Sequence, residues 1–437
     1  MNKTDSMHQR ALGLMPGGTQ LLSKRPQLFA PGRWPAWFRR AKGVEIEDLD
    51  GRVWTDVSLH GIGAFPLGYA DPDVDDAVID AIRSGVASTL NCPVDVELAE
   101  LLCELHPWAD QVKFSRTGGE ALAVAVRIAR AATGRERVAV CGYHGWHDWY
   151  IAANLGDRNA LDGHLLPEID PLGVPRSLEG TTLTFPGEDP EALEALIEQN
   201  QGQLAAIVME PARYRMPPAG FLERVRELAD RAGAVLVFDE VTVGFRMHPG
   251  GLHRRVGVDP DLATFAKGMS NGYAMSAVIG RREVMKAAAG SFISSTSWTE
   301  RVGPTAALAT IQKLRRLTAH ERLAEAGERM RAGWLAAAER HGLKMSSKGL
   351  SPLPSFAFDH GEHNKALHTL YTHRMLDRGY LASSAFYASL AHSDAVIDAA
   401  LEATDAAFES LAQTLAAGRL QAELPDGVAW AGLRKQT

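Results

Sequence analysis

The sequence predicts an α/β fold, with a mostly parallel sheet covered by helices and a smaller α+β domain towards the C-terminus. Three observations support this prediction. Short apolar strands without polar alternation run through the middle of the chain, helical segments separate them, and the pattern changes near residue 316. Strands that are apolar on both faces are typical of parallel sheets buried between helices.

Strands and helices alternate in the middle region. The expected strands cover residues 137–142, 204–210, 234–240, 262–267 and 276–280. Strong helical signals cover residues 119–133 and 221–232, and each is followed by a glycine, Gly134 or Gly233. Glycine is a common residue just after a helix because it adopts the left-handed conformation at low cost. The alternation therefore predicts βαβ units.

The two ends of the chain have a different character. The first 60 residues are expected to form an irregular arm and then short strands, with a β-hairpin over residues 44–57 around Asp50-Gly51. After residue 316 the expected elements are a charged helix at 319–341, strands at 344–347 and 355–358, and helices at 364–378 and 393–416. We expect an arm that belongs to the small domain (1–60), a large domain (61–316) and a small C-terminal domain (317–437).

Composition excludes several classes of protein. The chain has 437 residues, of which 46% are apolar and 23% charged, so disorder is not expected. A net charge of −7 argues against a nucleic-acid-binding surface. The three cysteines lack C-x-x-C spacing, and no apolar run is long enough to span a membrane. We expect a cytoplasmic protein that acts on small molecules.

Polar residues end four of the predicted strands. Glu210 ends the second strand, Asp239 the third and Lys267 the fourth, and Tyr143 and His144 follow the first. Ligands of open α/β sheets bind at the carboxyl ends of the strands, so these side chains are candidates for a binding site. An ordinary capping role remains the alternative for each residue taken alone.

Lys267 and Asp239 each allow two interpretations. Lys267 stands between an apolar strand and a glycine-bearing loop, so it is either a surface lysine or a desolvated amine nucleophile. Asp239 ends a buried strand and needs a partner. That partner is either an arginine, for which Arg246 is a candidate, or the protonated ring nitrogen of a cofactor.

A glycine pair opens the strongest helix of the chain. In SRTGGEA, Gly118 and Gly119 allow backbone N–H groups to approach an anion, and the helix dipole adds to the attraction. The pattern suits phosphate, although an ordinary loop has the same composition. It is not a P-loop, because G-K-[ST] is missing.

Together these stretches resemble the class III, fold-type I aminotransferases that use pyridoxal 5′-phosphate, and most closely the glutamate-1-semialdehyde aminomutase branch. The matching segments are TGGEALAVAVRIARAATGR, GYHGWHD, VMEP, VLVFDEVTVGFR and PDLATFAKGMSNG. The resemblance covers roughly residues 40–400. It implies the fold-type I architecture and a homodimer with shared active sites.

The resemblance also implies roles for single residues. Lys267 would form a Schiff base with the cofactor and then move a proton between substrate and cofactor. Asp239 would keep the pyridinium nitrogen protonated, so that the ring accepts electrons. The implied cofactor contacts are Thr117, Gly118 and Gly119 near the phosphate, Tyr143 and Val241 on the two ring faces, His144, Glu210 beside the phenolic oxygen, and Thr296 from the neighbouring subunit.

Two departures favour an ordinary transaminase over an aminomutase. Tyr387 stands where the aminomutases carry a glutamate, and their N-terminal N-S-P-V-R is represented only by GGTQLLSKR, in which Ser23 or Arg25 could stand in. We therefore expect an amino group to move from an amine or amino acid to a keto or aldehyde acceptor, through pyridoxamine phosphate. An aminomutase or a racemase on the same scaffold is the alternative.

Substrate contacts are less specified. Trp146, Trp149 and Tyr150 either line a pocket for an apolar or sugar-like amine or pack a dimer interface. Arg301, Tyr387 and Arg25 are further candidates. No arginine lies between Arg378 and Arg419 to clamp a second carboxylate, which arginine would bind best.

Two other classes are less well supported. A metal-dependent hydrolase could use His144, His147 and Asp148, or the residues of DHGEH at 359–363, but neither set has the H-E-x-x-H arrangement on a helix. No metal is expected. A non-catalytic relative that binds the cofactor would lack the lysine, and Lys267 is present.

Overall fold

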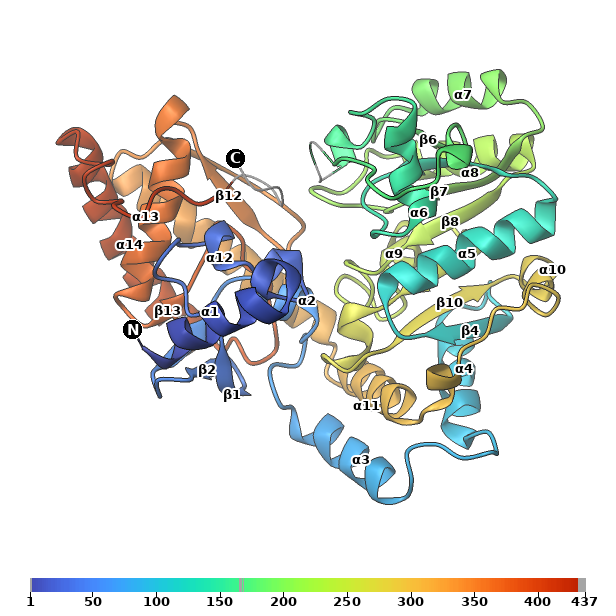
Figure 1. The fold of residues 1–437 in the computed structure, drawn as a ribbon, viewed down its shortest axis with the longest axis horizontal. Helices are drawn as coiled ribbons and strands as arrows, with labels where there is room; N and C mark the ends of the chain where they lie inside the picture. Colours follow the sequence, from blue (N-terminus) through green and yellow to red (C-terminus); the bar gives the residue numbers. More distant parts are fainter. Residues whose placement is uncertain (1, 165–166, 168, 431–437) are drawn as a thin grey trace. The chain divides into compact units, whose positions relative to one another are not determined.

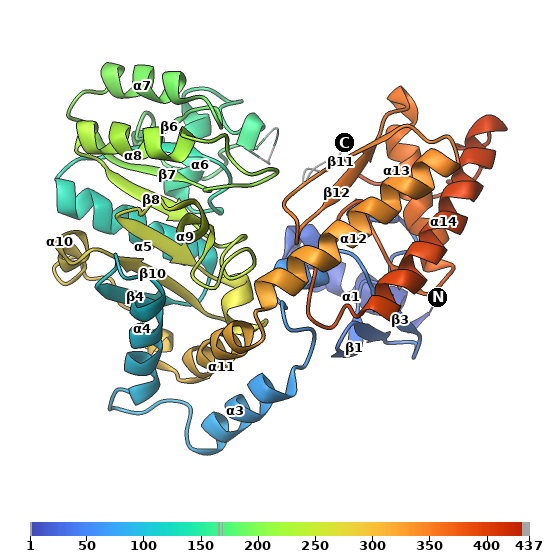
Figure 2. The same cartoon turned by 180° about the vertical axis from the view of Figure 1, so that it is seen from behind.

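The computed structural model describes residues 2–164, 167 and 169–430, and it divides the chain into two compact units (Figures 1 and 2). The central unit comprises Pro72–His320. The terminal unit comprises Met1–Asp71 together with Glu321–Thr437. Its two segments thus combine the arm and the C-terminal domain, with divisions at 71 and 320 where the sequence places them at 60 and 316.

The central unit holds a seven-stranded sheet. Its strands are β4 (Gln111–Ser115), β5 (Arg137–Cys141), β6 (Thr182–Thr184), β7 (Leu204–Met209), β8 (Val235–Asp239), β9 (Leu262–Phe265) and β10 (Ser276–Gly280). Their order in the sheet is β4-β10-β9-β8-β7-β5-β6. The five strands from β9 to β6 are parallel, whereas β10 is antiparallel to both β4 and β9. The expected mostly parallel sheet is therefore confirmed, with β4 and β6 as strands that the sequence analysis missed.

Helices cover both faces of this sheet. The helices of the central unit, not all of which contact the sheet, are α3 (Pro72–Arg83), α4 (Pro93–Leu105), α5 (Gly118–Thr133), α6 (Asp148–Ile151), α7 (Pro190–Gln199), α8 (Phe221–Ala232), α9 (Leu252–Val256), α10 (Arg282–Met285) and α11 (Val302–Arg316). Short 3₁₀ helices are η4 (Ala152–Leu155), η5 (Asp162–His164), η6 (Arg176–Leu178), η7 (Lys267–Ser270), η8 (Lys286–Ala288) and η9 (Thr296–Thr299).

Alternate side chains of each strand pack against different helices. Val138 and Val140 of β5 join a cluster with α5, whereas Ala139 joins a cluster with α7 and α8. Figures 1 and 2 show α5 on one face of the sheet and α7 and α8 on the other. Residues from both faces of β5, β7 and β8 are buried, which explains why these strands lack polar alternation in the sequence.

The terminal unit is built from elements of both ends of the chain. From the N-terminal segment come α1 (Lys3–Leu14), η1 (Pro16–Gly18), η2 (Leu22–Lys24), η3 (Pro26–Leu28), β1 (Phe38–Lys42), β2 (Glu45–Asp48), β3 (Val53–Asp56) and α2 (His60–Gly63). From the C-terminal segment come α12 (Ala319–Arg340), β11 (Met345–Lys348), β12 (Ser355–Phe358), η10 (Gly361–His363), α13 (Asn364–Leu376), β13 (Tyr380–Leu381) and α14 (Asp394–Ala416).

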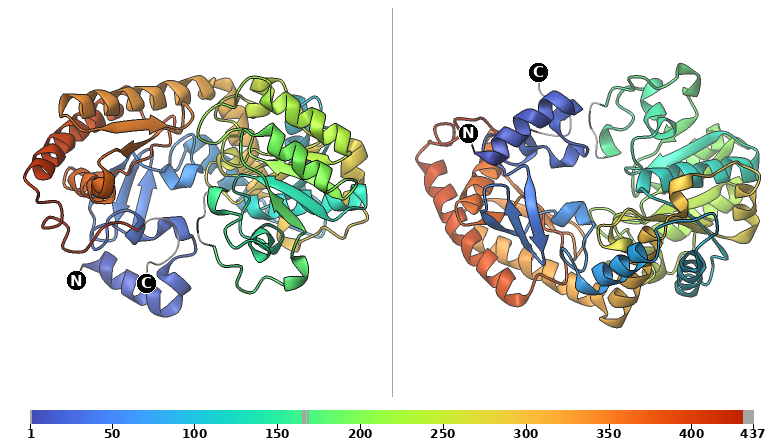
Figure 3. Two further views of the ribbon diagram at one scale, coloured as in Figure 1. Left: turned by 90° about the horizontal axis from the view of Figure 1, so that it is seen from above. Right: turned by 60° about the horizontal axis from the view of Figure 1, so that its bottom comes forward.

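Two small sheets organise this unit. The strands β1, β2, β3 and β13 form one sheet, in which the β2–β3 pairing confirms the predicted hairpin, and β11 and β12 form the other. Figure 3 shows α12 running beside the β11–β12 pair. The ring of Trp334 on α12 meets Phe356 on β12 with centroids 4.9 Å apart, within an apolar cluster that also includes α13 and α14.

The arm is more regular than expected. Residues Lys3–Leu14 form helix α1, which Asn2 caps by accepting a hydrogen bond from the Asp5 amide. The carboxylate of Asp50, in the hairpin turn, accepts further bonds from the amides of Lys3 and Thr4. The expectation of an irregular start was therefore wrong. Among the described residues, no helix is long and apolar enough to cross a membrane.

Candidate active site

A cavity of about 610 Å³ lies in the central unit, beyond the carboxyl ends of β8 and β9 and at the start of α5. It is lined by Arg116, Thr117, Gly118, Gly119, Glu120, Leu122, Tyr143, Gly145, Trp146, His147, Asp239, Val241, Thr242, Ala266, Lys267, Tyr273 and Met275. The position agrees with the rule that open α/β sheets bind ligands at the carboxyl ends of their strands.

The start of α5 forms one wall of the cavity. Thr117 caps the helix: its hydroxyl accepts a bond from the Glu120 amide, and Glu120 accepts one from the Thr117 amide. Gly118 and Gly119 follow as the first helical residues, whose N–H groups have no carbonyl partner within a helix. A Cβ on Gly118 would lie 2.9 Å from a Val241 methyl group, and one on Gly119 would lie 3.0 Å from the His147 ring. Glycine at these two positions thus lets Val241 and His147 approach the main chain closely.

Asp239 reaches the cavity from the end of β8 and is held by a histidine. Its carboxylate lies 2.8 Å from Nδ1 of His144 and accepts a bond of 3.0 Å from the Val241 amide. The His144 ring is fully buried, and its Nε2 lies 3.1 Å from the carbonyl oxygen of Cys141. Both ring nitrogens face acceptors, so the ring cannot turn without losing a contact. His144 therefore fixes the orientation of Asp239.

Lys267 is the second residue after β9, and its side chain lines the cavity. Its backbone is in the left-handed region, with φ of +47°, which is uncommon for a residue other than glycine. Nζ donates a 2.9 Å hydrogen bond to Oγ1 of Thr242. Burial lowers the pKa of Lys267, although the negative charges of Asp239 and Glu210 oppose this effect. A lowered pKa favours the neutral amine, which is the nucleophilic form.

Glu210 holds the main chain of Tyr143, a residue that lines the cavity. Glu210 directly follows β7, and its carboxylate accepts a 3.1 Å bond from the Tyr143 amide and an ion-pair contact from Arg213. Burial raises the pKa of Glu210, and Arg213 opposes that change. The Tyr143 ring itself lines the cavity, and burial raises the pKa of its hydroxyl.

The residues expected around the cofactor fall into three groups. Seven of them line the cavity: Thr117, Gly118, Gly119, Tyr143, Asp239, Val241 and Lys267. His144 and Glu210 hold members of that group from behind. Thr296 starts η9 and is exposed.

The candidate substrate residues are more scattered. Trp146 lines the cavity, is 72% exposed and stacks on His147 with ring centroids 4.3 Å apart. Trp149 and Tyr150, by contrast, are buried in the core cluster of α5, so neither expected role of these two rings, in a pocket or at an interface, fits their place. Arg301 directs Nη1 towards the Gly85 carbonyl oxygen. Arg25 and Tyr387 belong to the terminal unit.

Several residues at the cavity were missed. Arg116 donates to the carbonyl oxygens of Trp298 and Glu300 and pairs with the Glu300 carboxylate at 2.9 Å. Tyr273 donates to Asp75, and burial together with this bond raises its pKa to about 12. Thr242 could have been suspected, because it lies only three residues after Asp239. The others depend on contacts between distant segments.

The alternative metal ligands do not form a cluster. His144 bonds to Asp239, whereas His147 stacks on Trp146. Within residues 2–164, 167 and 169–430, no group of three or more histidine, cysteine, aspartate or glutamate side chains is arranged to hold a metal ion.

Comparisons with known proteins identify the family. The chain matches the family described as Aminotransferase class-III over residues 30–399. The chain belongs to the class III aminotransferases. It is an aminotransferase that uses pyridoxal 5′-phosphate and moves an amino group from an amine or amino-acid donor to a keto or aldehyde acceptor.

Two curated relatives are 34% identical to the chain. One is the 3-aminobutyryl-CoA aminotransferase of Cloacimonas acidaminovorans, matched over 82% of this chain and 84% of that protein. The other is the 2′-deamino-2′-hydroxyneamine transaminase of Streptomyces kanamyceticus, matched over 75% of this chain and 79% of that protein. The substrates in these two names differ widely, one a coenzyme A thioester and one an aminosugar.

Solved structures confirm the fold. The FumI protein of Sphingopyxis sp. MTA144, in its internal aldimine form with the cofactor, superposes with a TM-score of 0.85 at 26% identity and covers 95% of this chain and 97% of its own. A glutamate-1-semialdehyde aminomutase of Pseudomonas aeruginosa shares 20% identity at a TM-score of 0.78, with 94% of each chain covered, which shows the fold alone. Because the relatives at 34% identity are an aminotransferase and a transaminase, the aminotransferase interpretation is favoured over the aminomutase alternative.

Proposed function

We propose that Lys267 is the lysine that carries pyridoxal 5′-phosphate as a Schiff base and that Asp239 binds its ring nitrogen. The observation that carries this assignment is that both side chains line one cavity whose wall is the start of α5. When bound there, the cofactor supplies an electron sink for a carbanion next to the amino group.

Each of the chain's own residues then has a task. The N–H groups of Gly118 and Gly119 and the α5 dipole bind the phosphate. Tyr143 and Val241 would confine the ring, and Glu210, which holds the Tyr143 amide, would act on the side of its phenolic oxygen. Asp239, held by His144, keeps the ring nitrogen protonated. Lys267 moves a proton at its Nζ, as a general base and acid, and Thr242 holds that amine when it is free.

We expect the amine donor to carry an apolar or sugar-like body rather than a second carboxylate. Trp146 offers an exposed ring at the cavity. Arg116, the arginine that lines the cavity, already bonds to carbonyl oxygens through Nη1 and Nη2 and pairs with Glu300 through Nε. Nη1 and Nη2 are therefore occupied and the charge is paired with Glu300, so we do not expect Arg116 to clamp a substrate carboxylate. Arg301, Tyr387 and Arg25 are kept as further substrate candidates.

A homodimer with shared active sites is the second part of the proposal. A row of apolar side chains is exposed on and after α3 and at the start of α4: Ile79, Ile82, Val86, Leu90 and Val96. Exposed apolar patches of this kind are typical of interfaces between subunits. Thr296 is exposed as well, and we assign it to the phosphate of the neighbouring subunit.

We also assign the enzyme to the cytoplasm. Cys92, Cys103 and Cys141 are all free thiols. Unpaired cysteines suit a reducing compartment. Fractionation of the source cells, with activity measured in each fraction, tests this assignment.

The central experiment is reduction of the purified enzyme with borohydride. We expect a yellow protein in which the cofactor becomes fixed to Lys267, as peptide mapping would show. Lys267→Ala should bind the cofactor noncovalently and not transaminate. A label on another lysine, or normal turnover by the variant, contradicts the assignment.

Mixing two inactive variants tests the shared site. Lys267→Ala lacks the amine, and Thr296→Ala should bind the cofactor poorly. In a mixed dimer, one of the two sites has both residues intact, so activity should return after subunit exchange. No return of activity, with mixed dimers present, refutes the role of Thr296 across the interface.

A half-reaction screen addresses the donor. The absorbance of the enzyme-bound cofactor is followed with amines, amino acids, aminosugars and dicarboxylic amino acids. We expect apolar or sugar-like amines to react faster than dicarboxylic ones. Turnover of a single substrate without any acceptor would instead indicate the aminomutase or racemase alternative.

A further inference from the structure

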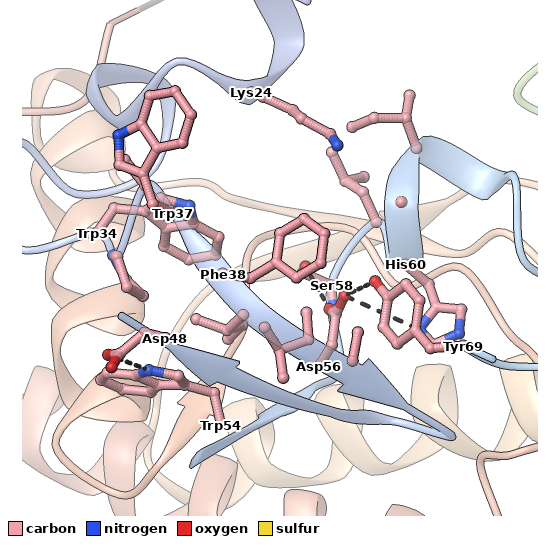
Figure 4. A pocket seen from close by; sticks show the side chains of 18 of the residues that line it. Lys24, Trp34, Trp37, Phe38, Asp48, Trp54, Asp56, Ser58, His60 and Tyr69 are labelled. Atoms are coloured by element: carbon pink, nitrogen blue, oxygen red, sulfur yellow. Dashed lines mark hydrogen bonds and ion pairs between the residues drawn. The ribbon is translucent and has the colours of Figure 1, made fainter. Parts of the chain in front are cut away.

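A second cavity, of about 350 Å³, lies wholly within the terminal unit (Figure 4). Its lining is mostly aromatic and aliphatic: Phe29, Trp34, Pro35, Ala36, Trp37, Phe38, Ala41, Ile46, Trp54, Leu59, Gly61, Ile62, Phe65, Tyr69, Ala70 and Leu381. The polar lining residues are Lys24, Asp48, Asp56, Ser58 and His60. A concave apolar site with few polar groups is typical of small-molecule binding.

The sequence builds this cavity from strand register. Ala41 pairs with Ile46, and Ile46 pairs with Trp54, so the three side chains lie side by side on one face of the β1–β2–β3 sheet. Phe29 and Trp34 form a stacked pair with centroids 4.2 Å apart. Figure 4 shows Phe38, Trp37 and Lys24 above the sheet. The cavity thus has a sheet for a floor and aromatic rings for walls.

The two acidic side chains of the lining are already satisfied. The Asp48 carboxylate accepts bonds from the amides of Asp50 and Arg52 and a 2.9 Å bond from the Trp54 indole. Carboxylates that accept several N–H bonds have little need of a further cation. Asp48 therefore acts as an anchor for the hairpin and not as a ligand group.

Asp56 is held in the same way. It accepts bonds from the amide and hydroxyl of Ser58 and a 2.6 Å bond from the Tyr69 hydroxyl. Burial and the charge of Asp56 raise the pKa of Tyr69 well above its ordinary value, so Tyr69 remains a donor. Figure 4 shows these bonds at one end of the cavity. A ligand cation would find both carboxylates occupied.

Lys24 is the remaining charge at the cavity. It ends η2, and its side chain is exposed while it contributes to the lining. No ion pair of Lys24 is found in the part of the chain that the structure describes. Figure 4 shows its amine directed towards the cavity from above. An anion at this position would gain a charged partner without displacing an existing one.

We propose that this cavity binds an amphipathic carboxylate, with its aryl or alkyl body on the rings of Trp34, Trp37 and Phe38 and its head group at Lys24. Aromatic walls favour an apolar body, since burying apolar surface is the main driving force for such binding. No residue that lines this cavity also lines the one that contains Lys267. Its occupancy does not depend on the proposed function.

Calorimetric titration of the holoenzyme with 4-phenylbutanoate tests the proposal. We expect one molecule bound per chain, with a negative heat-capacity change from apolar burial. The alcohol 4-phenylbutan-1-ol has the same body without the charge and should bind more weakly, by roughly threefold, as exposed ion pairs contribute modestly. Equal binding of acid and alcohol, or tighter binding of 4-phenylbutylamine, refutes the role of Lys24.

Four variants locate the bound molecule. Lys24→Gln should weaken the acid by roughly threefold and leave the alcohol unchanged. Lys42→Gln, which removes an exposed lysine of β1 outside the lining, should change neither. Ala41→Phe fills the cavity from its floor and should lower the affinity for both ligands at least tenfold. Lys267→Ala should bind both normally, so loss of binding there places the ligand in the other cavity and overturns the proposal.

A second filling variant guards against misfolding. Ala36→Phe fills the same cavity from the segment before β1, and the far-ultraviolet circular dichroism and activity of both filling variants are compared with those of the parent enzyme. Unchanged ligand binding in both filling variants, with the fold intact, contradicts the proposed site.

Discussion

Asp239 and Glu240 are neighbours at the end of β8, and they show how one kind of contact serves two purposes. Each carboxylate lies 2.8 Å from Nδ1 of a buried histidine, His144 for Asp239 and His253 for Glu240. Successive side chains of a strand point to opposite faces of the sheet. The two acid–histidine pairs therefore lie on different sides of the same strand.

The surroundings of the two pairs differ. Asp239 lines the cofactor cavity and accepts one further bond, from the Val241 amide. Glu240 accepts bonds from the amides of Leu252 and His253, and His253 in turn accepts a bond from the Trp108 indole. Glu240 thus anchors the start of α9, whereas Asp239 is left to meet a ligand. Both carboxylates are buried and both contact a histidine, so these two features do not distinguish the binding role of Asp239 from the structural role of Glu240. The further hydrogen bonds of each carboxylate distinguish them.

The largest effect is expected for Asp239→Asn. Removing the charge that keeps the ring nitrogen protonated should lower kcat about 10³-fold, within the range of acid–base effects, while the melting temperature stays close to that of the parent. Steady-state kinetics and thermal melting of the same preparation measure both quantities. A large loss of stability with kcat retained would place Asp239 in the same class as Glu240.

Glu240→Ala should show the opposite pattern. It leaves two amides and a histidine of the fully buried network without their acceptor, which should reduce the free energy of unfolding by about 3 kcal/mol. Denaturant titration measures this loss, and kcat per folded molecule should stay within about threefold. Glu240→Gln, which keeps an acceptor oxygen, serves as the milder control.

Acid should destabilise the fold through the histidines that pack near Glu240. His106 stacks on His253 with centroids 5.3 Å apart, and burial together with His253 lowers the pKa of His106 to about 4. Unfolding returns the ring to its ordinary pKa near 6.5, so the unfolded chain binds a proton that the folded chain does not. The free energy of unfolding should therefore fall by up to about 3 kcal/mol as pH drops from about 6.5 to about 4.

His106→Phe tests this origin, because it removes the titrating ring and keeps an aromatic group. Denaturation midpoints of the variant should depend less steeply on pH in this window than those of the parent. An unchanged pH dependence would show that other histidines dominate.

The smallest effect is expected for Thr242→Val, which acts on the Asp239 side. It removes the acceptor for Nζ of Lys267 and keeps the shape of the side chain. One neutral hydrogen bond is worth about 1 kcal/mol, so kcat should fall about fivefold. Thr242→Ser should restore the rate. A variant as active as the parent would show that Lys267 needs no such partner.

Much of the central unit follows from local sequence, because its strands are buried on both faces. Continuous apolar runs at β5, β7 and β8 predict parallel strands, and glycines mark the ends of α5 and α8. The antiparallel orientation of β10 could not be predicted, because the apolar sequence of a strand does not show whether it runs parallel or antiparallel to its neighbours. Helix α1 was missed although Asn2 caps it locally, and part of its stabilisation comes from Asp50, far along the chain.

The candidate site divides in the same way. Lys267, Asp239 and the glycine pair could be predicted because strand ends and helix starts are visible in sequence. Trp146 and Trp149 could not be told apart from sequence, although one is 72% and the other 7% exposed, because only Trp149 lies within the short helix α6 and Trp146 precedes it. The commitment of Arg116 to Glu300 depends on residues that meet only in the folded chain.

The cap of α5 has a consequence for sequence change around the cofactor. The Thr117 hydroxyl accepts a bond from the Glu120 amide, and the Glu120 carboxylate accepts one from the Thr117 amide. Both side chains are therefore occupied, and the site that we assign to the phosphate is made of main-chain N–H groups. A saturation library should then tolerate truncation of most side chains near it. The library should instead lose activity where a substitution adds atoms, at Gly118 and Gly119 first. A new side chain at these positions would collide with its neighbours.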